Sequence, residues 1–146
     1  AEVFSHHENR SGFCLHRRLA KEAVAGMMAR SRFCLAPSGE GFGCRLPELM
    51  IRGGCVPVII QPAVIQPYED VLPYETFSLR FNFSDISRLH TLLDAITPQQ
   101  YAALKAGARR FAQAFDWWSP RGLAYEYMRY SLCIRAGIAC KHLKPK

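Results

Sequence analysis

A glycine-rich segment at residues 37–43 is the stretch whose composition points most directly to chemistry. It follows a short apolar run and precedes a stretch with helical character, so its backbone N–H groups would gather at the amino end of a helix. Such a turn binds phosphate groups, because close backbone approach and the helix dipole both favour an anion. The segment lacks the Gly-Lys-Ser/Thr ending of a P-loop and the G-x-G-x-x-G spacing of a dinucleotide site. The glycines that would allow the close approach are Gly39, Gly41 and Gly43.

Two charged side chains in the following helix could complete such a site. Arg45 would lie in the first turn, where a guanidinium can bind a diphosphate through two parallel hydrogen bonds. Glu48, three residues on, shares that helix face, and its carboxylate can accept hydrogen bonds from ribose hydroxyls. Together with the glycine-rich segment, these residues predict a nucleotide-sugar site. The alternative is an ordinary turn in which Arg45 and Glu48 only pair with each other at the surface.

The elements that must position this site predict a βαβ unit. Residues 32–36 and 55–60 are apolar enough to be buried strands, and residues 44–52 predict a helix with Pro47 in its first turn. Two strands joined in this way are parallel, with a right-handed crossover. Pro57 inside the second strand indicates an edge strand or an irregular start. The predicted fold class is α/β.

Further elements are predicted on both sides of this unit. Apolar residues at helical spacing predict a helix over residues 18–30. Downstream, a proline-containing loop is expected over residues 61–76 and a third strand over residues 77–82. Three later signals predict helix starts: Ser84, the capping box Thr97-Pro98-Gln99-Gln100, and Ser119-Pro120. The polar, aperiodic start predicts an irregular segment over residues 1–17, followed by one domain over residues 18–146.

The composition is that of one globular domain without a membrane span. Of the 146 residues, 49% are hydrophobic and 21% are charged, and nine Phe and six Tyr can form a core. No apolar run approaches the roughly 20 residues that cross a bilayer. The first residues lack the apolar region of a signal peptide. Because the sequence starts without Met, we expect a processed product or a fragment of a longer protein.

The net charge of +7 is concentrated in the last third of the chain, where residues 101–146 hold nine basic and two acidic side chains. Basic surfaces attract phosphates, anionic lipids and acidic polymers. An alternative function is therefore a non-catalytic basic module that binds an anionic polymer, with the glycine-rich segment acting only as a turn. The charge also fits a solvated helix face with a lysine-rich tail.

Cysteine and histidine spacings predict no metal site and leave the catalytic base unassigned. The six cysteines form no C-x-x-C pair and no zinc-finger cluster. Cys34 and Cys55 lie in apolar runs, where cysteine is commonly a small buried hydrophobe; a disulfide would also fit, but spacing assigns no pairing. Trp117 and Trp118 could stack on a sugar or a nucleobase, but are expected in the core or at a domain interface. The histidines expected at the surface are His6, His7, His16 and His90.

The chain contains five blocks in a particular order: Ser31-Arg32-Phe33-Cys34-Leu35-Ala36-Pro37, Gly39-x-Gly41, Arg45-x-x-Glu48, Gly54-Cys55-Val56-Pro57-Val58, and Pro67-Tyr68. In this order and spacing they resemble the exostosin-like glycosyltransferases, over about residues 25–115. The resemblance implies a GT-B fold. This chain would be its C-terminal, donor-binding half, a Rossmann-like three-layer domain with a short parallel sheet.

The resemblance also implies what the site holds. In that family this half binds a UDP-sugar, and the loop from Ser38 through Glu40 to Gly43 would face the diphosphate. Arg45 would neutralise the diphosphate, and Glu48 would hold the ribose. The expected activity is transfer of a sugar from a nucleotide-sugar to a polysaccharide or glycoprotein glycan. No Asp-x-Asp motif occurs, which fits the usual metal independence of GT-B enzymes, so neither a metal cofactor nor a nucleic-acid partner is expected.

Members of the family are Golgi type II membrane proteins that build cell-wall or proteoglycan polysaccharides. The resemblance therefore implies a Golgi location, although this chain shows no targeting signal. It further implies a missing N-terminal half-domain that carries the acceptor contacts and the catalytic base of an inverting displacement, and an anchor outside this chain. A degenerate transferase that binds donor without turnover is a further alternative. The sequence departs from the family pattern at Cys44, at Leu46-Pro47 and at Gln61-Pro62-Ala63.

Overall fold

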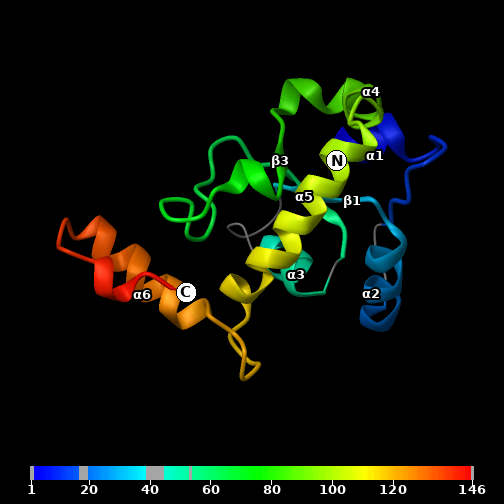
Figure 1. The fold of residues 1–146 in the computed structure, drawn as a ribbon. Coiled ribbons are helices and arrows are strands. Elements are labelled where there is room, and N and C mark those ends of the chain that lie inside the picture. Colours follow the sequence, from blue (N-terminus) through cyan, green and yellow to red (C-terminus); the bar gives the residue numbers. More distant parts are fainter. Residues whose placement is uncertain (1, 17–19, 39–44, 53, 146) are drawn as a thin grey trace.

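The fold, seen in a computed structural model that describes residues 2–16, 20–38, 45–52 and 54–145, is α/β (Figure 1). Three parallel strands form one sheet in the order β1-β2-β3. The strands are β1 (Phe33–Pro37), β2 (Val56–Ile60) and β3 (Leu79–Arg80). The predicted βαβ unit with parallel strands is confirmed. The third strand is shorter than the predicted range of residues 77–82.

Strand β2 lies in the middle of the sheet, so the expectation of an edge strand at Pro57 is wrong. All five residues of β2 are buried. The Val56 N–H donates toward β1, to the carbonyl of Arg32 at 2.9 Å, and the Ile59 carbonyl accepts from Phe81 on the β3 side. Because pairing directions alternate along a strand, the nitrogen of Pro57 faces the β3 side. β3 pairs only from Val58 onward, so the missing N–H of Pro57 removes no ladder bond.

Helices α2 (Lys21–Arg30) and α3 (Arg45–Arg52) cover one face of the sheet, and both confirm predicted helices. From α3, Leu46 and Met50 join a core cluster with Ile59 of β2. Met28 of α2 and Leu49 of α3 pack around the residues of β1 on the same face. Gly54, two residues after the end of α3, adopts a positive φ of 67°, a conformation that suits glycine at the end of a helix.

The other face is covered by helix α1 (Glu2–His7), 3₁₀ helix η2 (Phe83–Arg88) and helix α4 (Leu89–Asp94). Val3 of α1 and Leu89 of α4 pack against Val58 and Ile60. With helices on both faces, the sheet forms the middle of three layers. The predicted irregular start is wrong for residues 2–7, while the predicted domain boundary at residue 18 stays a prediction.

His7 fixes α1 to this layer. Its side chain is 1% exposed, its Nε2 lies 2.6 Å from the carbonyl oxygen of Ile86, and its ring stacks on Phe13 at 4.4 Å. The expectation of a surface histidine is therefore wrong for His7, because a tertiary contact buries it. The cap of η2 is Asn82 rather than the predicted Ser84, since the Asn82 N–H donates to the carboxylate of Asp85 at 3.0 Å.

Helix α5 (Pro98–Phe111) begins with the predicted capping box, in which the Gln100 N–H donates to Thr97 Oγ1 at 3.2 Å. Figure 1 shows α5 running in front of the sheet. Two aromatic side chains of α5 contact residues near the starts of β1 and β3. The Tyr101 ring meets Phe33, at the start of β1, and the Phe111 ring meets Phe77, just before β3. Between these contacts, α5 approaches 3₁₀ helix η1 (Tyr74–Thr76) closely.

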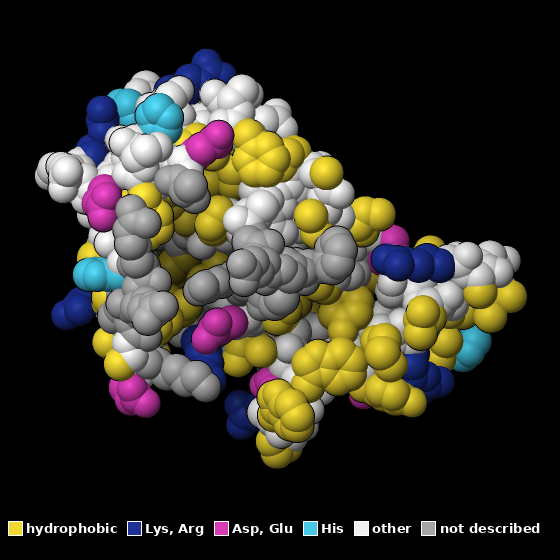
Figure 2. All heavy atoms as spheres, turned by 180° about the vertical axis from the view of Figure 1, so that it is seen from behind, with side chains coloured by type: hydrophobic (Ala, Val, Ile, Leu, Met, Phe, Trp, Pro, Cys, Tyr) yellow, Lys and Arg dark blue, Asp and Glu magenta, His cyan; other side chains and the backbone are white. Residues whose placement is uncertain are grey.

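Helix α6 (Ala124–Arg135) follows 3₁₀ helix η3 (Ala112–Phe115) and a turn, and it projects from the rest of the molecule in Figure 1. The helix starts later than predicted, because Ser119 lies in a turn closed by a hydrogen bond from the Gly122 N–H at 2.9 Å. Trp118 is 91% exposed and Trp117 is half exposed, so the expected core role is wrong. Figure 2 shows hydrophobic side chains gathered over this projecting part. The chain closes with 3₁₀ helix η4 (Lys141–Leu143).

Two disulfides join cysteines of the described part, Cys34–Cys55 and Cys133–Cys140. The first connects β1 to the residue that precedes β2, and thereby closes the segment that contains α3. Cys34 and Cys55 are buried as expected, but they are bonded rather than acting as free hydrophobes. Cys14 is free and exposed. Within the described ranges, no helix combines the length and apolar character that a membrane span requires.

Candidate functional site

The carboxyl ends of the three strands form one edge of the sheet, because all three strands are parallel. In α/β folds, ligands bind at this edge, beyond the strand ends. Here β1 ends at Pro37, α3 begins at Arg45, and the predicted donor loop is the connection between them. Ser38 begins that connection, and its N–H and hydroxyl both point to the Ile60 carbonyl, at 3.2 and 3.3 Å. The ends of β1 and β2 are thus tied together at the residue where the connection begins.

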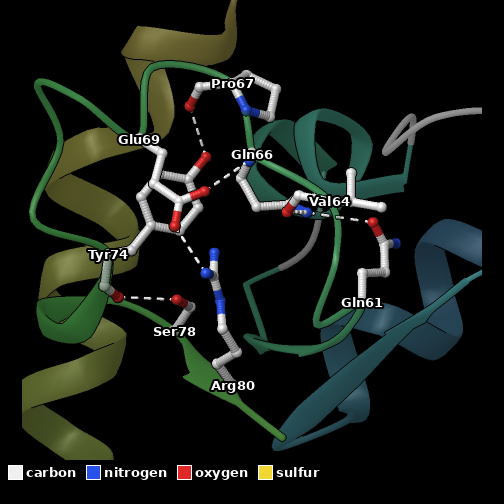
Figure 3. Close-up of polar contacts among 8 residues, drawn as sticks. All are labelled: Gln61, Val64, Gln66, Pro67, Glu69, Tyr74, Ser78 and Arg80. Atoms are coloured by element: carbon white, nitrogen blue, oxygen red, sulfur yellow. Dashed lines mark hydrogen bonds and ion pairs between the residues drawn. The ribbon is translucent and has the colours of Figure 1, made fainter. Parts of the chain in front are cut away.

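The amide of Gln61 reinforces this tie, and Figure 3 shows its contact with Gln66. Gln61 follows β2 directly and is 4% exposed. Its Nε2 donates to the carbonyls of Ala36 and Pro37, at 3.2 and 3.1 Å, and its Oε1 accepts from Gln66 at 3.1 Å. Both amide hydrogens are therefore used in positioning the last residues of β1. The side chain acts as a clamp at the base of the loop.

A second part of the network reaches the end of β3. The Gln66 N–H donates to Glu69 Oε2 at 2.7 Å, and the Arg80 guanidinium donates to Glu69 Oε1 at 2.6 Å. Gln66 itself is 1% exposed. Figure 3 shows these residues converging between β3 and the loop after β2, with the Tyr74 hydroxyl pointing toward Pro67. The Tyr74 hydroxyl donates to the Pro67 carbonyl at 2.6 Å, which holds the loop from its other side.

Electrostatics favour the charged form of Glu69. Burial raises the pKa of Glu69, but the hydrogen bonds from Arg80 and from the Gln66 N–H outweigh it, so the pKa lies below its ordinary value. A carboxylate held ionised in this way is a poor proton acceptor near neutral pH. Burial also raises the pKa of Tyr74. Glu69 therefore serves as an anchor for Arg80 rather than as a catalytic base.

The next residues connect this edge to α6. Tyr68 has a positive φ of 58°, an unfavourable conformation for a residue with a side chain. Its hydroxyl donates to the Ala124 carbonyl at 3.0 Å. Asp70 accepts from the Ser131 hydroxyl at 2.8 Å and from Arg135 Nε at 2.8 Å. Although burial raises the pKa of Asp70, these hydrogen bonds lower it overall. The strained turn is thus held by contacts to α6.

The predicted site residues stand as follows. Ser38 is placed at the carboxyl end of β1, and Arg45 is the first residue of α3, so both belong to the same edge. Glu48 is half-buried and faces Arg52 at 3.9 Å, one turn further along α3. In the alternative of an ordinary turn, Glu48 would pair with Arg45. The side chain of Arg45 lies outside the described part. The predicted residues that also lie outside the described part are Gly39, Glu40, Gly41 and Gly43.

Sequence reasoning missed the clamp and its neighbours. Gln61 was noted only as a departure from a family pattern, although a polar residue directly after a buried strand is a usable signal for this edge. Glu69 and Arg80 were not singled out, because eleven positions of loop and strand separate them in sequence. In the described ranges, no three metal-ligating side chains come together.

Comparison with known proteins agrees with this geometry. The exostosin GT47 domain family matches residues 2–96, well over half of the chain. The chain belongs to the exostosin GT47 family. The matched region of this exostosin chain contains β1, α3, β2 and β3, and with them the whole carboxyl-edge network. It ends before α5 and α6.

Relatives of this exostosin chain are named as glycosyltransferases. A probable glycosyltransferase of Arabidopsis thaliana is 33% identical over 138 residues, which cover 91% of this chain and 26% of the relative. A probable beta-1,4-xylosyltransferase of the same plant is 37% identical over 49% of this chain and 17% of its own length. Exostosin-2 of Bos taurus is 27% identical over 61% of this chain and 12% of its own length. The exostosin chain therefore spans about a quarter or less of these relatives.

Proposed function

We propose that this chain is the donor-binding part of a glycosyltransferase that moves a sugar from a UDP-sugar to a polysaccharide or glycoprotein glycan. The proposal rests on the hydrogen-bond network at the carboxyl ends of the strands, found in a chain of the exostosin GT47 family. There, Ser38 and Gln61 tie the ends of β1 and β2 together, at the base of the connection to α3. Strand ends that hydrogen bonds hold together suit a loop whose backbone N–H groups must bind a diphosphate.

The chemistry required of this part is stabilisation of the leaving diphosphate. In the proposal, backbone N–H groups of the loop and the amino end of α3 accept the negative charge, and Arg45 adds a guanidinium. Glu48 would bind the ribose, and Arg52 at 3.9 Å would keep its carboxylate oriented. Removing one such charge contact costs about 2–4 kcal/mol of transition-state stabilisation in enzymes that act this way. No metal is required for this scheme.

The remaining roles are assigned to the longer protein. We propose that an N-terminal half of the same GT-B fold supplies the acceptor contacts and the base, and that an anchor places the enzyme in the Golgi. The exposed apolar side chains of the projecting part would suit contact with such a half. They include Trp117, Trp118, Tyr125, Leu132 and Ile138. The lengths of the relatives, of which this chain spans 26% or less, support a larger enzyme.

Calorimetric titration of the purified chain with UDP tests the donor site. Wild type should bind, and Arg45→Ala should weaken binding by at least about tenfold, because a charge-assisted contact is lost. Arg121→Ala removes an equal charge from an exposed turn before α6 and should leave the affinity within about twofold. Absence of any UDP heat with folded protein would remove the proposal, and so would equal losses in both variants.

A further inference from the structure

Helix α5 has an unusual charge pattern for a surface helix. Its 14 residues include Lys105, Arg109 and Arg110 but no Asp or Glu. Lys105 and Arg109 are four residues apart and thus neighbours on one helix face, where like charges repel. The helix dipole favours cations in the last turn, which accounts for Arg109 and Arg110. It does not account for Lys105, which lies in the middle of the helix.

A third cation joins this face from outside the helix. The Arg32 guanidinium lies 4.8 Å from the centre of the Tyr101 ring, and the Lys105 ammonium lies 5.6 Å from the same ring centre. Tyr101, Lys105 and Arg109 are spaced by four residues, so they form a line along α5. We call Arg32, Tyr101, Lys105 and Arg109 the α5 ridge. Each cation–ring contact attracts, but it leaves the positive charge uncompensated.

The three cations of the α5 ridge have no carboxylate within ion-pair distance in the described part of the chain. Other cations of the molecule differ in this respect. Arg80 pairs with Glu69, and Arg135 pairs with Asp70. Arg32 and Lys105 lie over one aromatic ring, and a row of cations without carboxylate partners is suited to an external polyanion.

We propose that the α5 ridge binds an anionic polysaccharide, a polymer of sugars that carry carboxylates. The ridge is a line rather than a concave site, and its three cations are distributed along it, so it fits an extended chain better than a single small anion. Tyr101 contacts Phe33 at the start of β1, whereas the proposed donor loop leaves the end of β1. The ridge is therefore separate from the donor site.

Two other polyanionic partners fit the ridge less well. Single-stranded nucleic acids bind to aromatic rings with free faces, on which bases stack. Here Arg32 and Lys105 both lie over the single ring of the ridge. Membrane surfaces bind helices whose cations flank large apolar side chains. The residues beside the ridge on α5 are small, namely Ala102 and Ala106, and both are exposed. The choice of a glycan also rests in part on the proposed function.

Binding of polygalacturonate to the purified chain tests the proposal. The double variant Lys105→Ala, Arg109→Ala should bind about tenfold more weakly than wild type at about 0.15 M salt, because two ionic contacts are lost. The matched control is Arg129→Ala with Lys141→Ala. It removes the same charge from α6 and η4, including a cation that lies 5.7 Å from the Tyr125 ring centre. This control should stay within about twofold of wild type.

The outcomes separate the alternatives. If the ridge cations only stabilised the fold, their removal would lower the unfolding temperature of the double variant. The proposal instead expects an equal or higher unfolding temperature, because the repulsion between Lys105 and Arg109 is removed. Equal losses in both double variants would overturn the proposal, since binding would then follow net charge alone. It would also be overturned if a single-stranded oligonucleotide or phosphatidylserine vesicles bound wild type more tightly than polygalacturonate did. UDP titration of the ridge variant should be unchanged, so failure of either site is distinguishable from failure of the other.

Discussion

The side-chain amide of Gln61 donates to the carbonyl of Pro37 at 3.1 Å, across the carboxyl ends of the two longest strands. The same nitrogen reaches the carbonyl of Ala36 at 3.2 Å. These two carbonyls belong to the last residues before the connection to α3. A side chain that follows β2 thus determines where the chain leaves β1.

Substitution Gln61→Leu should lower the free energy of unfolding by about 1–3 kcal/mol, because the Ala36 carbonyl and the Gln66 amide each lose a partner in a buried region. Urea denaturation measures the loss. The control is Gln99→Leu, the same substitution at an exposed position of α5, which should change stability by less than about 0.5 kcal/mol. Similar effects at both positions would show that the clamp contributes nothing.

Two helical glycines should respond to alanine with opposite signs. A Cβ at Gly107 would lie 2.1 Å from the backbone oxygen of Thr76, so Gly107→Ala must displace α5 or η1 and should destabilise by about 1–3 kcal/mol. A Cβ at Gly26, in α2, would meet nothing within 4 Å. Gly26→Ala should therefore stabilise by about 0.5–1 kcal/mol through helix propensity. Thermal unfolding of both variants is the measurement, and a loss of stability at Gly26 would contradict it.

Removal of the Cys34–Cys55 disulfide should destabilise the chain strongly. The bond joins residues 21 positions apart, and loops of that size stabilise by about 3 kcal/mol when closed. The double variant Cys34→Ala, Cys55→Ala should show this loss in chemical denaturation. Cys14→Ala, at the free exposed cysteine, is the control and should change stability by less than about 0.5 kcal/mol. Unaltered stability in the double variant would show that the bond does not constrain the unfolded chain.

The Glu69–Arg80 pair should make stability depend on acid. The pKa of Glu69 is lower in the folded chain than its ordinary value of about 4.3. Its contribution is therefore complete above that value and is lost as the pH falls through the lower folded pKa. The difference in unfolding free energy between wild type and Glu69→Gln should shrink between about pH 7 and about pH 3.

The control for this acid dependence is Asp94→Asn, at an exposed carboxylate that ends α4. The difference between wild type and this variant should change much less over the same pH range. A constant difference for Glu69→Gln would mean that the ion pair does not hold Glu69 in its charged form.

Local signals were sufficient to predict the central βαβ unit. Two apolar runs predicted β1 and β2, and the segment between them, with Pro47 in its first turn, predicted α3. All three elements lie close to their predicted bounds. The capping box at Thr97 was found for the same reason, since both of its hydrogen bonds join residues three positions apart. Patterns of this kind are complete within one segment of sequence.

Features that depend on distant partners were not predictable in this way. His7 is buried because Ile86, 79 positions away, accepts its hydrogen bond. Pro57 predicts an edge strand or an irregular start, and a central strand tolerates it only because β3 pairs from Val58 onward. The role of Gln61 depends on the carbonyls of another strand, so its residue type alone pointed to no partner.

Glu69 and Asp70 are consecutive carboxylates whose partners lie in different elements. Glu69 holds Arg80 at the end of β3, whereas Asp70 holds Ser131 and Arg135 of α6. Two adjacent residues therefore connect the projecting helix to the end of β3. Any displacement of α6 that moves Asp70 must therefore pass through the residue that fixes the Arg80 guanidinium.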